Sequence, residues 1–255
     1  MNSLNAMEDI GDRCKEVIVC SDPAALGRET AVLFTELARK AARERDRFTV
    51  ALSGGSTPRI LYRALTGSPF IEKIPWEQVH LFWGDERFVP PDHPDANYRM
   101  VYEILISKIP IPKENVHRMP CEGSVPQTAA AEYEERLRSF FGISGKGTPS
   151  FDLALLGIGT DGHTASLFPG SSALAEKERW VVAPYVEKLK STRLTLTVPV
   201  FNDALHVVFI VSGKEKASIM KELLDVADPQ CRYPAALIRP RRGKRRFYLD
   251  KPAAG

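Results

Sequence analysis

The sequence predicts an α/β fold built around a mostly parallel, buried central sheet. Short runs of β-branched and aliphatic residues alternate with longer segments of helical periodicity, and most of these short runs are apolar on both faces. Hydrophobic residues make up 44% of the 255 residues and charged residues 26%, which is typical of a globular protein with a full core. We therefore expect one domain that spans residues 1–255.

The alternation begins with a strand at residues 17–20 and a helix at 23–44, whose apolar side chains recur at helical spacing. Gly, Pro or polar turn residues flank each later strand. Further strands are predicted over residues 48–52, 78–83, 153–156, 194–198 and 206–211, with a strand-like run at 246–249, and further helices over 58–65, 97–107, 128–141 and 214–224. Residues 142–149 are interpreted as an exposed loop, because the alternation resumes directly after them.

Charge and cysteine usage argue against several functional classes. The formal net charge of +3 is too small to predict a nucleic-acid partner. We interpret the basic run at 239–246 as a solvated turn, although a basic patch would also attract an anionic substrate. Neither C-x-x-C spacing nor clustered histidines accompany the cysteines, so we expect free thiols and no metal site. The cysteines are Cys14, Cys20, Cys121 and Cys231.

The N-terminal residues are acidic and lack the apolar run of a secretory leader, and no segment reaches the ~18 apolar residues of a membrane span. We therefore expect a cytoplasmic protein with no membrane partner. The sequence does not distinguish a monomer from a small homo-oligomer.

Ligands of open α/β sheets bind beyond the carboxyl ends of the strands, so the segments that follow strands are the candidate sites. After residue 52 comes a run whose glycines and hydroxyls would bring N–H and O–H donors to an anion, and Pro58 then begins a helix. The run lacks the spacing of a nucleotide P-loop. A plain glycine turn is the alternative interpretation. The candidate substrate-binding residues are Ser53, Gly54, Gly55, Ser56 and Thr57.

Charged side chains lie close to three other predicted strands. Asp85 and Arg87 come directly after a buried strand, where Arg87 would bind a phosphate or stabilise a neighbouring carboxylate; a surface ion-pair set is the alternative. Lys216 lies at the start of a predicted helix, where a cation is unfavourable unless an anion binds. Arg193, beside the strand at 194–198, is a further candidate cation.

Residues 157–170 contain G-x-G-x-x-G, yet Pro169 and Gly170 would stop a helix after about two turns, unlike the full helix of a dinucleotide site. We instead expect the glycines to present His163 as a general base near neutral pH. Asp161 would orient the ring or cap the short helix. A structural histidine is the alternative.

In this order the segments resemble the 6-phosphogluconolactonase family, over nearly the whole chain. The most specific element is 157–170, which is similar to that family's G-x-G-x-D-G-H-T-A-S-L-F-P signature. The resemblance implies a three-layer Rossmann-like domain of the glucosamine-6-phosphate deaminase type and hydrolysis of a sugar-phosphate lactone without a cofactor. It also implies that His163 activates water, that residues 53–57 line the cleft, and that Arg87, Arg193 and Lys216 carry charge to the phosphate or lactone oxygens.

Two other functions remain open at this point. Glucosamine-6-phosphate deaminases share the fold, but their pattern places a glutamate where this chain has Phe168, so an acid for proton transfer is missing. A sugar-phosphate sensor would need a DNA-reading module, for which the residues before the first strand are too few.

Overall fold

A seven-stranded sheet forms the centre of this computed structural model, in which residues 15–123, 125–224 and 233–255 are described. All its strand pairs are parallel, in the order β1-β11-β10-β6-β2-β3-β5. The prediction of a mostly parallel sheet is thereby confirmed. The strands are β1 (Lys15–Cys20), β2 (Phe48–Leu52), β3 (Val79–Trp83), β5 (Val116–His117), β6 (Leu153–Leu156), β10 (His206–Val211) and β11 (Lys244–Asp250).

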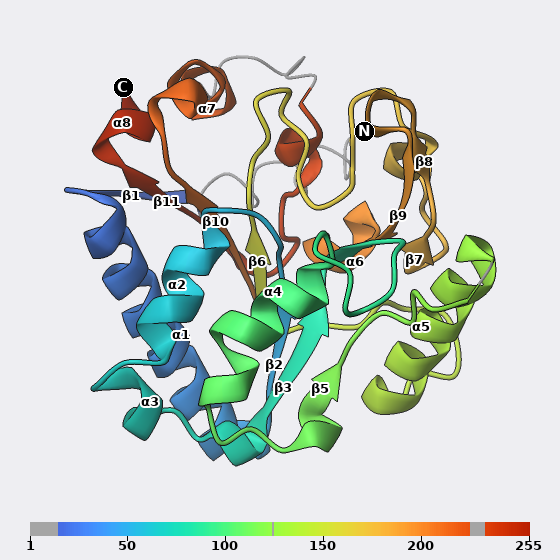
Figure 1. Cartoon of the computed structure of the whole chain (residues 1–255), viewed down its shortest axis with the longest axis horizontal. Helices are drawn as coiled ribbons and strands as arrows, with labels where there is room; N and C mark the ends of the chain where they lie inside the picture. Colours follow the sequence, from blue (N-terminus) through green and yellow to red (C-terminus); the bar gives the residue numbers. More distant parts are fainter. Residues whose placement is uncertain (1–14, 124, 225–232) are drawn as a thin grey trace, which may run out of the picture.

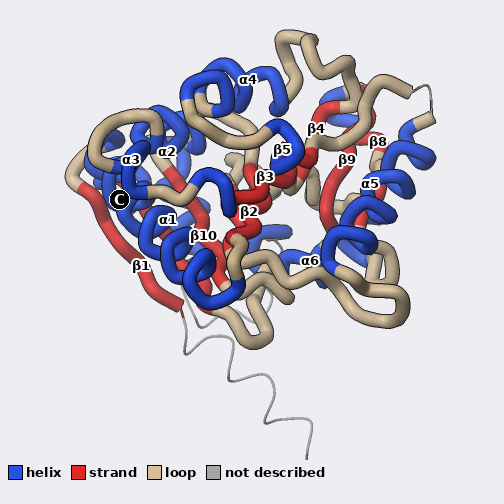
Figure 2. Tube along the Cα trace, turned by 90° about the horizontal axis from the view of Figure 1, so that it is seen from below, coloured by secondary structure: helices blue, strands red, loops and turns tan. Residues whose placement is uncertain are grey.

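Helices cover both sides of this sheet (Figures 1 and 2). Strands β2, β6 and β10 are buried almost throughout, because each is a run of apolar residues that packs against helices on two faces. The helices are α1 (Pro23–Arg45), α2 (Pro58–Leu65), α3 (Phe70–Lys73), α4 (Asn97–Ile104), α5 (Pro126–Phe141), α6 (Val198–Asn202), α7 (Ala217–Leu224) and α8 (Lys251–Ala254). None of the helices in the described part of the chain is long and apolar enough to cross a membrane.

A second, antiparallel sheet lies beside the first one. It contains a strand that was expected in the parallel sheet. The strand predicted at 194–198 does not join the parallel sheet; it is β9 (Ser191–Leu196), which pairs with β4 (Asp85–Arg87), β7 (Val181–Val182) and β8 (Tyr185–Val186). Gly84 connects the two sheets, since its N–H donates to Leu52 O at 2.8 Å and its carbonyl accepts from Leu196 N at 2.8 Å. The charged segment after β3 is therefore an edge strand of the antiparallel sheet, joined to β3 through Gly84.

Three smaller expectations also change. The helix predicted at 97–107 ends at Ile104, and residues 214–216 form a 3₁₀ turn before α7. Arg245 is only 5% exposed and its Nη1 donates to Ile238 O at 3.2 Å, so the basic run is not a solvated turn throughout. Cys20 and Cys121 are buried free thiols, whereas Cys14 and Cys231 lie outside the described residues.

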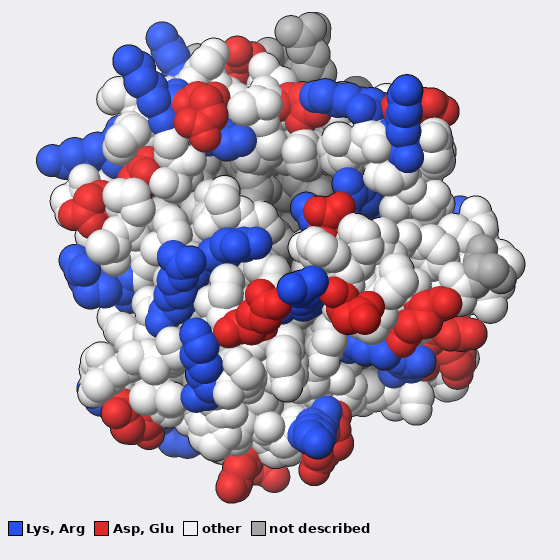
Figure 3. Space-filling view, in the orientation of Figure 1, with Lys and Arg blue, Asp and Glu red and all other residues white. Residues whose placement is uncertain are grey.

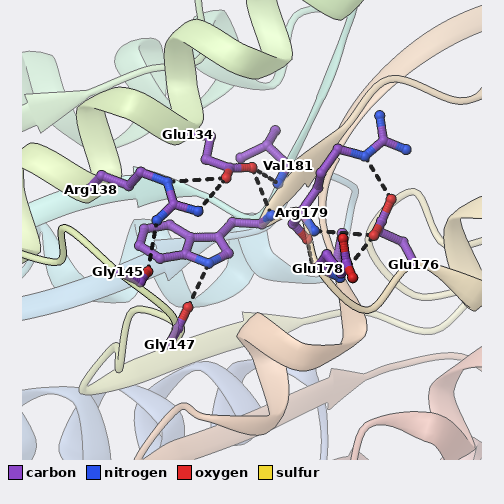
Figure 4. Close-up of polar contacts among 10 residues, drawn as sticks. Glu134, Arg138, Gly145, Gly147, Glu176, Glu178, Arg179 and Val181 are labelled. Atoms are coloured by element: carbon purple, nitrogen blue, oxygen red, sulfur yellow. Dashed lines mark hydrogen bonds and ion pairs between the residues drawn. The ribbon is translucent and has the colours of Figure 1, made fainter.

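One carboxylate ties α5 to the second sheet (Figure 4). Glu134 Oε1 accepts from Arg138 Nη2 at 2.8 Å, and its Oε2 accepts from Trp180 N at 2.8 Å. The guanidinium of Arg138 also lies over the Trp180 ring, 4.1 Å from the centroid. The ring nitrogen of Trp180 donates to Gly147 O at 2.8 Å, which fixes the loop that precedes β6.

Candidate active site

A cavity of about 260 Å³ opens beyond the carboxyl ends of β2, β3, β6 and β10. This is where a parallel sheet is expected to bind a ligand. Its lining contains most of the residues that the sequence singled out, although they come from distant parts of the chain. The lining residues are Ser53, Gly54, Gly55, Ser56, Thr57, Pro58, Asp85, Arg87, Asn97, Gly157, Ile158, Gly159, His163, Ala165, Ser212, Glu215 and Lys216.

The loop between β2 and α2 forms one wall of the cavity. The hydroxyl of Tyr62, on α2, accepts from Ser53 N at 3.1 Å and donates to Ser53 O at 2.7 Å, so the helix fixes the backbone where the loop begins. Gly54 packs so tightly against the Asn97 side chain that a Cβ would lie 1.9 Å from its Oδ1. Thr57 makes no side-chain cap, which leaves the first turn of α2 open to an anion.

The opposite wall is the loop after β6, which forms no helix. Gly162 N donates to Gly159 O at 3.0 Å and Gly159 N donates to His163 O at 2.8 Å, so the chain turns back on itself. A Cβ on Gly159 would lie 2.0 Å from His163 Nδ1, and therefore only glycine lets the ring pack there. The expected two-turn helix, with Asp161 as a possible cap, is wrong.

Asp161 instead contacts the imidazole of His163. His163 Nδ1 lies 2.5 Å from Asp161 Oδ1, and Lys188 Nζ lies 3.0 Å from the other oxygen, Oδ2. Partial burial would raise the pKa of Asp161, but the hydrogen bonds from His163 and Lys188 outweigh it and lower the pKa to about 2. With Nδ1 donating to an ionised carboxylate, Nε2 keeps a lone pair that accepts a proton.

Phe168 stacks on the His163 ring, with centroids 4.2 Å apart and an interplanar angle of 23°. The stack fixes the ring plane from one face of the imidazole, whereas Asp161 binds the ring edge at Nδ1. Phe168 does not line this cavity; it lines a neighbouring one of about 350 Å³, together with Asp161 and Lys188.

Strand β4 supplies a carboxylate and a guanidinium to the cavity. Asp85 is 7% exposed, and its Oδ2 accepts from Ser166 Oγ at 2.7 Å. Arg87 Nη1 donates to Asp95 O at 2.5 Å. Arg87 faces Arg193 across the β4–β9 pair, and burial followed by this neighbouring charge lowers the pKa of Arg193. Two adjacent cations of this kind favour an anionic ligand.

Glu86, between these two residues, supports the same wall from behind. Its carboxylate accepts from the backbone N–H groups of Arg87 at 2.8 Å, Asn97 at 2.6 Å and Tyr98 at 2.7 Å. Burial raises the pKa of Glu86 to about 7, against the opposing effect of these three donors. Sequence reasoning did not distinguish the buried Glu86 from the charged residues on either side of it.

The segment after β10 completes the cavity. Ser212 Oγ donates to Asp250 Oδ2, and Gly213 N donates to Asp250 Oδ1 at 3.1 Å, so β11 fixes the start of the 3₁₀ turn that carries Lys216. Lys216 and Glu215 both line the cavity, and the pair brings charges of opposite sign to this side. Charged side chains of both signs also mix over the face shown in Figure 3.

The structure thus gathers Ser53 to Thr57, Asp85, Arg87, His163 and Lys216 around one cavity. Asp161 and Arg193 are not part of its lining; Asp161 contacts His163, and Arg193 lies opposite Arg87 in the β4–β9 pair. Sequence reasoning missed Asn97, Ser212 and Glu215, of which only Ser212 directly follows a predicted strand. Within the described residues, no three His, Cys, Asp or Glu side chains group as metal ligands do.

Comparisons with known proteins point in one direction. The profile of the family described as Glucosamine-6-phosphate isomerases/6-phosphogluconolactonase matches residues 21–247. A Synechocystis protein named 6-phosphogluconolactonase is 42% identical over 239 residues, which cover 93% of this chain and 96% of that protein. A protein of the same name from Nostoc is 39% identical over 240 residues, or 94% and 97% of the two chains.

Solved structures share the architecture. A 6-phosphogluconolactonase from Trypanosoma cruzi superposes with a TM-score of 0.83 at 30% identity and covers 94% of this chain and 96% of its own. A monomeric glucosamine-6-phosphate deaminase superposes with a TM-score of 0.77 at 19% identity, over 94% and 98% of the two chains. The second likeness concerns the fold alone.

Proposed function

This chain belongs to the family of glucosamine-6-phosphate isomerases and 6-phosphogluconolactonases, and we propose that it hydrolyses 6-phospho-D-glucono-1,5-lactone to 6-phospho-D-gluconate in the oxidative pentose phosphate pathway. The observation that carries the proposal is the pair of His163 and Asp161 at the edge of a cavity with cationic side chains. The names of the relatives from Synechocystis and Trypanosoma cruzi support the same substrate.

The reaction needs one base, one water molecule and a donor for the developing oxyanion. In our proposal Nε2 of His163 takes a proton from water while the water oxygen bonds to the lactone carbonyl carbon. The tetrahedral intermediate then collapses and breaks the bond to the ring oxygen, which receives the proton from His163. Asp161 holds the ring through Nδ1 and stabilises its transient positive charge.

The charged and donor groups of the cavity have separate proposed roles. We assign the phosphate to residues 53–57 and the start of α2, together with Lys216 or Arg87. The other of these two cations would stabilise the oxyanion. Arg193 would act behind Arg87 and raise the positive potential there. Asp85, fixed by Ser166, would accept a hydrogen bond from a sugar hydroxyl.

The rival reaction in this family is deamination of glucosamine 6-phosphate. Phe168 argues against it, because an aromatic ring stacked on His163 supplies no group for the extra proton transfers of an isomerisation.

The test is to measure opening of freshly generated 6-phospho-D-glucono-1,5-lactone, corrected for spontaneous hydrolysis, beside ammonia release from glucosamine 6-phosphate. We expect lactone opening without ammonia. Ammonia release would replace the proposal by the deaminase, and inactivity on both substrates would favour a non-catalytic sugar-phosphate sensor.

We further propose that the chain acts in the cytoplasm, as a monomer or small homo-oligomer, without a cofactor or a nucleic-acid partner. The buried free thiols of Cys20 and Cys121 are compatible with a reducing compartment. Light scattering on the purified protein would measure the oligomeric state.

A further inference from the structure

The carboxylate of Asp161 is shared between two partners from different parts of the chain. His163, two residues away, binds Oδ1 through Nδ1 at 2.5 Å and through its backbone N at 3.3 Å. Lys188 binds Oδ2 through Nζ at 3.0 Å. No local sequence pattern links residue 188 to this loop, so the contact depends on how the second sheet docks beside the cavity.

A defined hairpin brings Lys188 to this position. Strand β8 pairs with β9, with Val186 opposite Ser191, and Lys188 lies in the 3₁₀ turn Glu187–Leu189 between them. The turn closes at Lys190, whose backbone is left-handed with φ 46° and whose N–H donates to Glu187 O at 3.1 Å. The neighbouring Val186 is buried. The ammonium of Lys188 is therefore carried by a fixed turn, although the side chain is 68% exposed.

Several other charged groups approach His163 from the elements around it. Among the described residues, Asp161 is the hydrogen-bond partner of the ring, and Phe168 covers one ring face. Glu187 lines the neighbouring cavity together with Asp161 and Lys188, and four more charged residues line the cavity of His163, two of each sign. They are Asp85 and Arg87 from β4 and Glu215 and Lys216 from the turn before α7. Lys188 is thus the cation bound directly to the carboxylate that orients the ring.

We propose that Lys188 is a positioning residue that sets the pH at which His163 becomes a base. An unshared carboxylate would stabilise the imidazolium strongly; a carboxylate whose second oxygen binds an ammonium stabilises it less. Lys188 therefore keeps His163 unprotonated at a lower pH. The inference rests on the proposed function for its catalytic meaning, but the ion pair has a consequence that can be measured without substrate.

The direct measurement is an NMR titration of the His163 ring, assigned with His163→Gln, in the wild type and in Lys188→Met. We expect the midpoint to rise by about 0.5 pH unit when Lys188 is removed, because an exposed ion pair contributes at most about 1 kcal/mol. Lys188→Arg should retain the wild-type midpoint. Lys190→Met removes the same charge two residues away without touching Asp161 and should leave the titration unchanged. Molar salt should shrink the difference between the wild type and Lys188→Met.

The acid limb of kcat/KM on the lactone should shift by the same amount in Lys188→Met, with activity above pH 8 nearly unchanged. A midpoint for His163 that stays at the wild-type pH or falls in Lys188→Met would overturn the inference. So would an equal loss of kcat/KM at every pH, since that is the signature of a purely structural contact. If the wild type opens no lactone while the NMR midpoint still shifts, the ion-pair role stands and the proposed function fails.

Discussion

His163 is held by contacts on three sides, and each of them comes from a nearby residue of the same loop. Asp161 binds Nδ1, Phe168 stacks on the ring, and the backbone of Gly159 lies directly against it. In the proposed mechanism, this arrangement leaves Nε2 as the nitrogen that takes the proton. A base fixed in this way has little freedom to lose when substrate binds, which favours catalysis.

Replacement of the base gives the first prediction. His163→Ala should fold normally, because the side chain is 31% exposed and its ring stacks on the partly buried Phe168 at the edge of the fold. We expect kcat/KM for lactone opening to fall on the order of 10²-fold or more, as for a lost general base. Steady-state kinetics would measure kcat/KM, and circular dichroism would show whether the variant is folded. Wild-type kcat/KM in a folded variant would remove His163 from the mechanism.

Gly159 gives a prediction that separates the position of the ring from its chemistry. In Gly159→Ala the new Cβ would lie 2.0 Å from Nδ1 and 2.8 Å from Asp161 Oδ1, so the ring and its partner must move. A displacement near 1 Å costs about 10²-fold, and we expect kcat/KM to fall by that order while His163 is still present. Gly145→Ala, where a Cβ meets nothing within 4 Å, is the matched control. Equal activity of both variants would show that the loop accommodates the methyl group.

The site residues that could be predicted from the sequence are those that directly follow strands. Residues 53–57, Asp85, Arg87 and the Asp161–His163 pair follow strands whose apolar runs are unambiguous, so their meeting at one sheet edge follows from parallel topology. Asn97 enters the cavity because Gly54 leaves room for it, and Lys188 reaches Asp161 because the β8–β9 hairpin lies beside the loop. Contacts of this kind depend on tertiary packing and leave no local pattern.

At the level of the elements, burial determined how well the boundaries could be predicted. Strands β2, β6 and β10 begin and end where the apolar runs do, since both faces of each are covered. Strand β9 is half-buried and belongs to the antiparallel sheet, and its partner β4 consists of three charged residues that show no strand pattern. Here pairing with a neighbour overrides intrinsic propensity.

The tie between α5 and the second sheet leads to a stability prediction. Glu134→Ala leaves the N–H of Trp180 and the guanidinium of Arg138 without their shared acceptor (Figure 4). We expect the free energy of unfolding to fall by about 1–3 kcal/mol, as for buried donors that lose a partner. Glu135→Ala, on the exposed face of the same helix, should change it by less than about 0.5 kcal/mol. Urea titrations would decide, and equal midpoints for the two variants would contradict the role of Glu134.

For the whole molecule, we expect partly buried histidines outside the cavity to lower the stability in acid. Burial, together with nearby cations, lowers the pKa of His117 to about 4 and that of His206 to about 4, and it also lowers the pKa of His80. The rings of His80 and His117 lie against each other, with Nδ1 of His80 3.3 Å from Nε2 of His117. Protonation of either ring would place a charge in a partly buried aromatic cluster that includes Phe82 and Phe140.

The sign of the effect follows from the direction of these pKa shifts. Because the folded protein binds protons more weakly than the unfolded chain, whose histidines titrate near 6.5, the contribution is complete above pH 6.5 and is lost as the pH falls toward 4. We expect the urea midpoint to decline between pH 6.5 and 4.5. His117→Phe keeps the stacking on Phe82 and removes one titrating group, so its decline should be shallower.

His93→Phe is the matched control, because that ring is 43% exposed and the substitution should leave the wild-type slope. The experiment also separates two causes of acid inactivation. Loss of the proposed base would lower kcat/KM without unfolding the protein, whereas protonation of His117 and His206 should lower the urea midpoint whether or not the cavity functions. If His117→Phe loses stability in acid as steeply as the wild type, the aromatic cluster tolerates the charge, and acid sensitivity must then arise from His206 or from the carboxylates that fix the loops around the cavity.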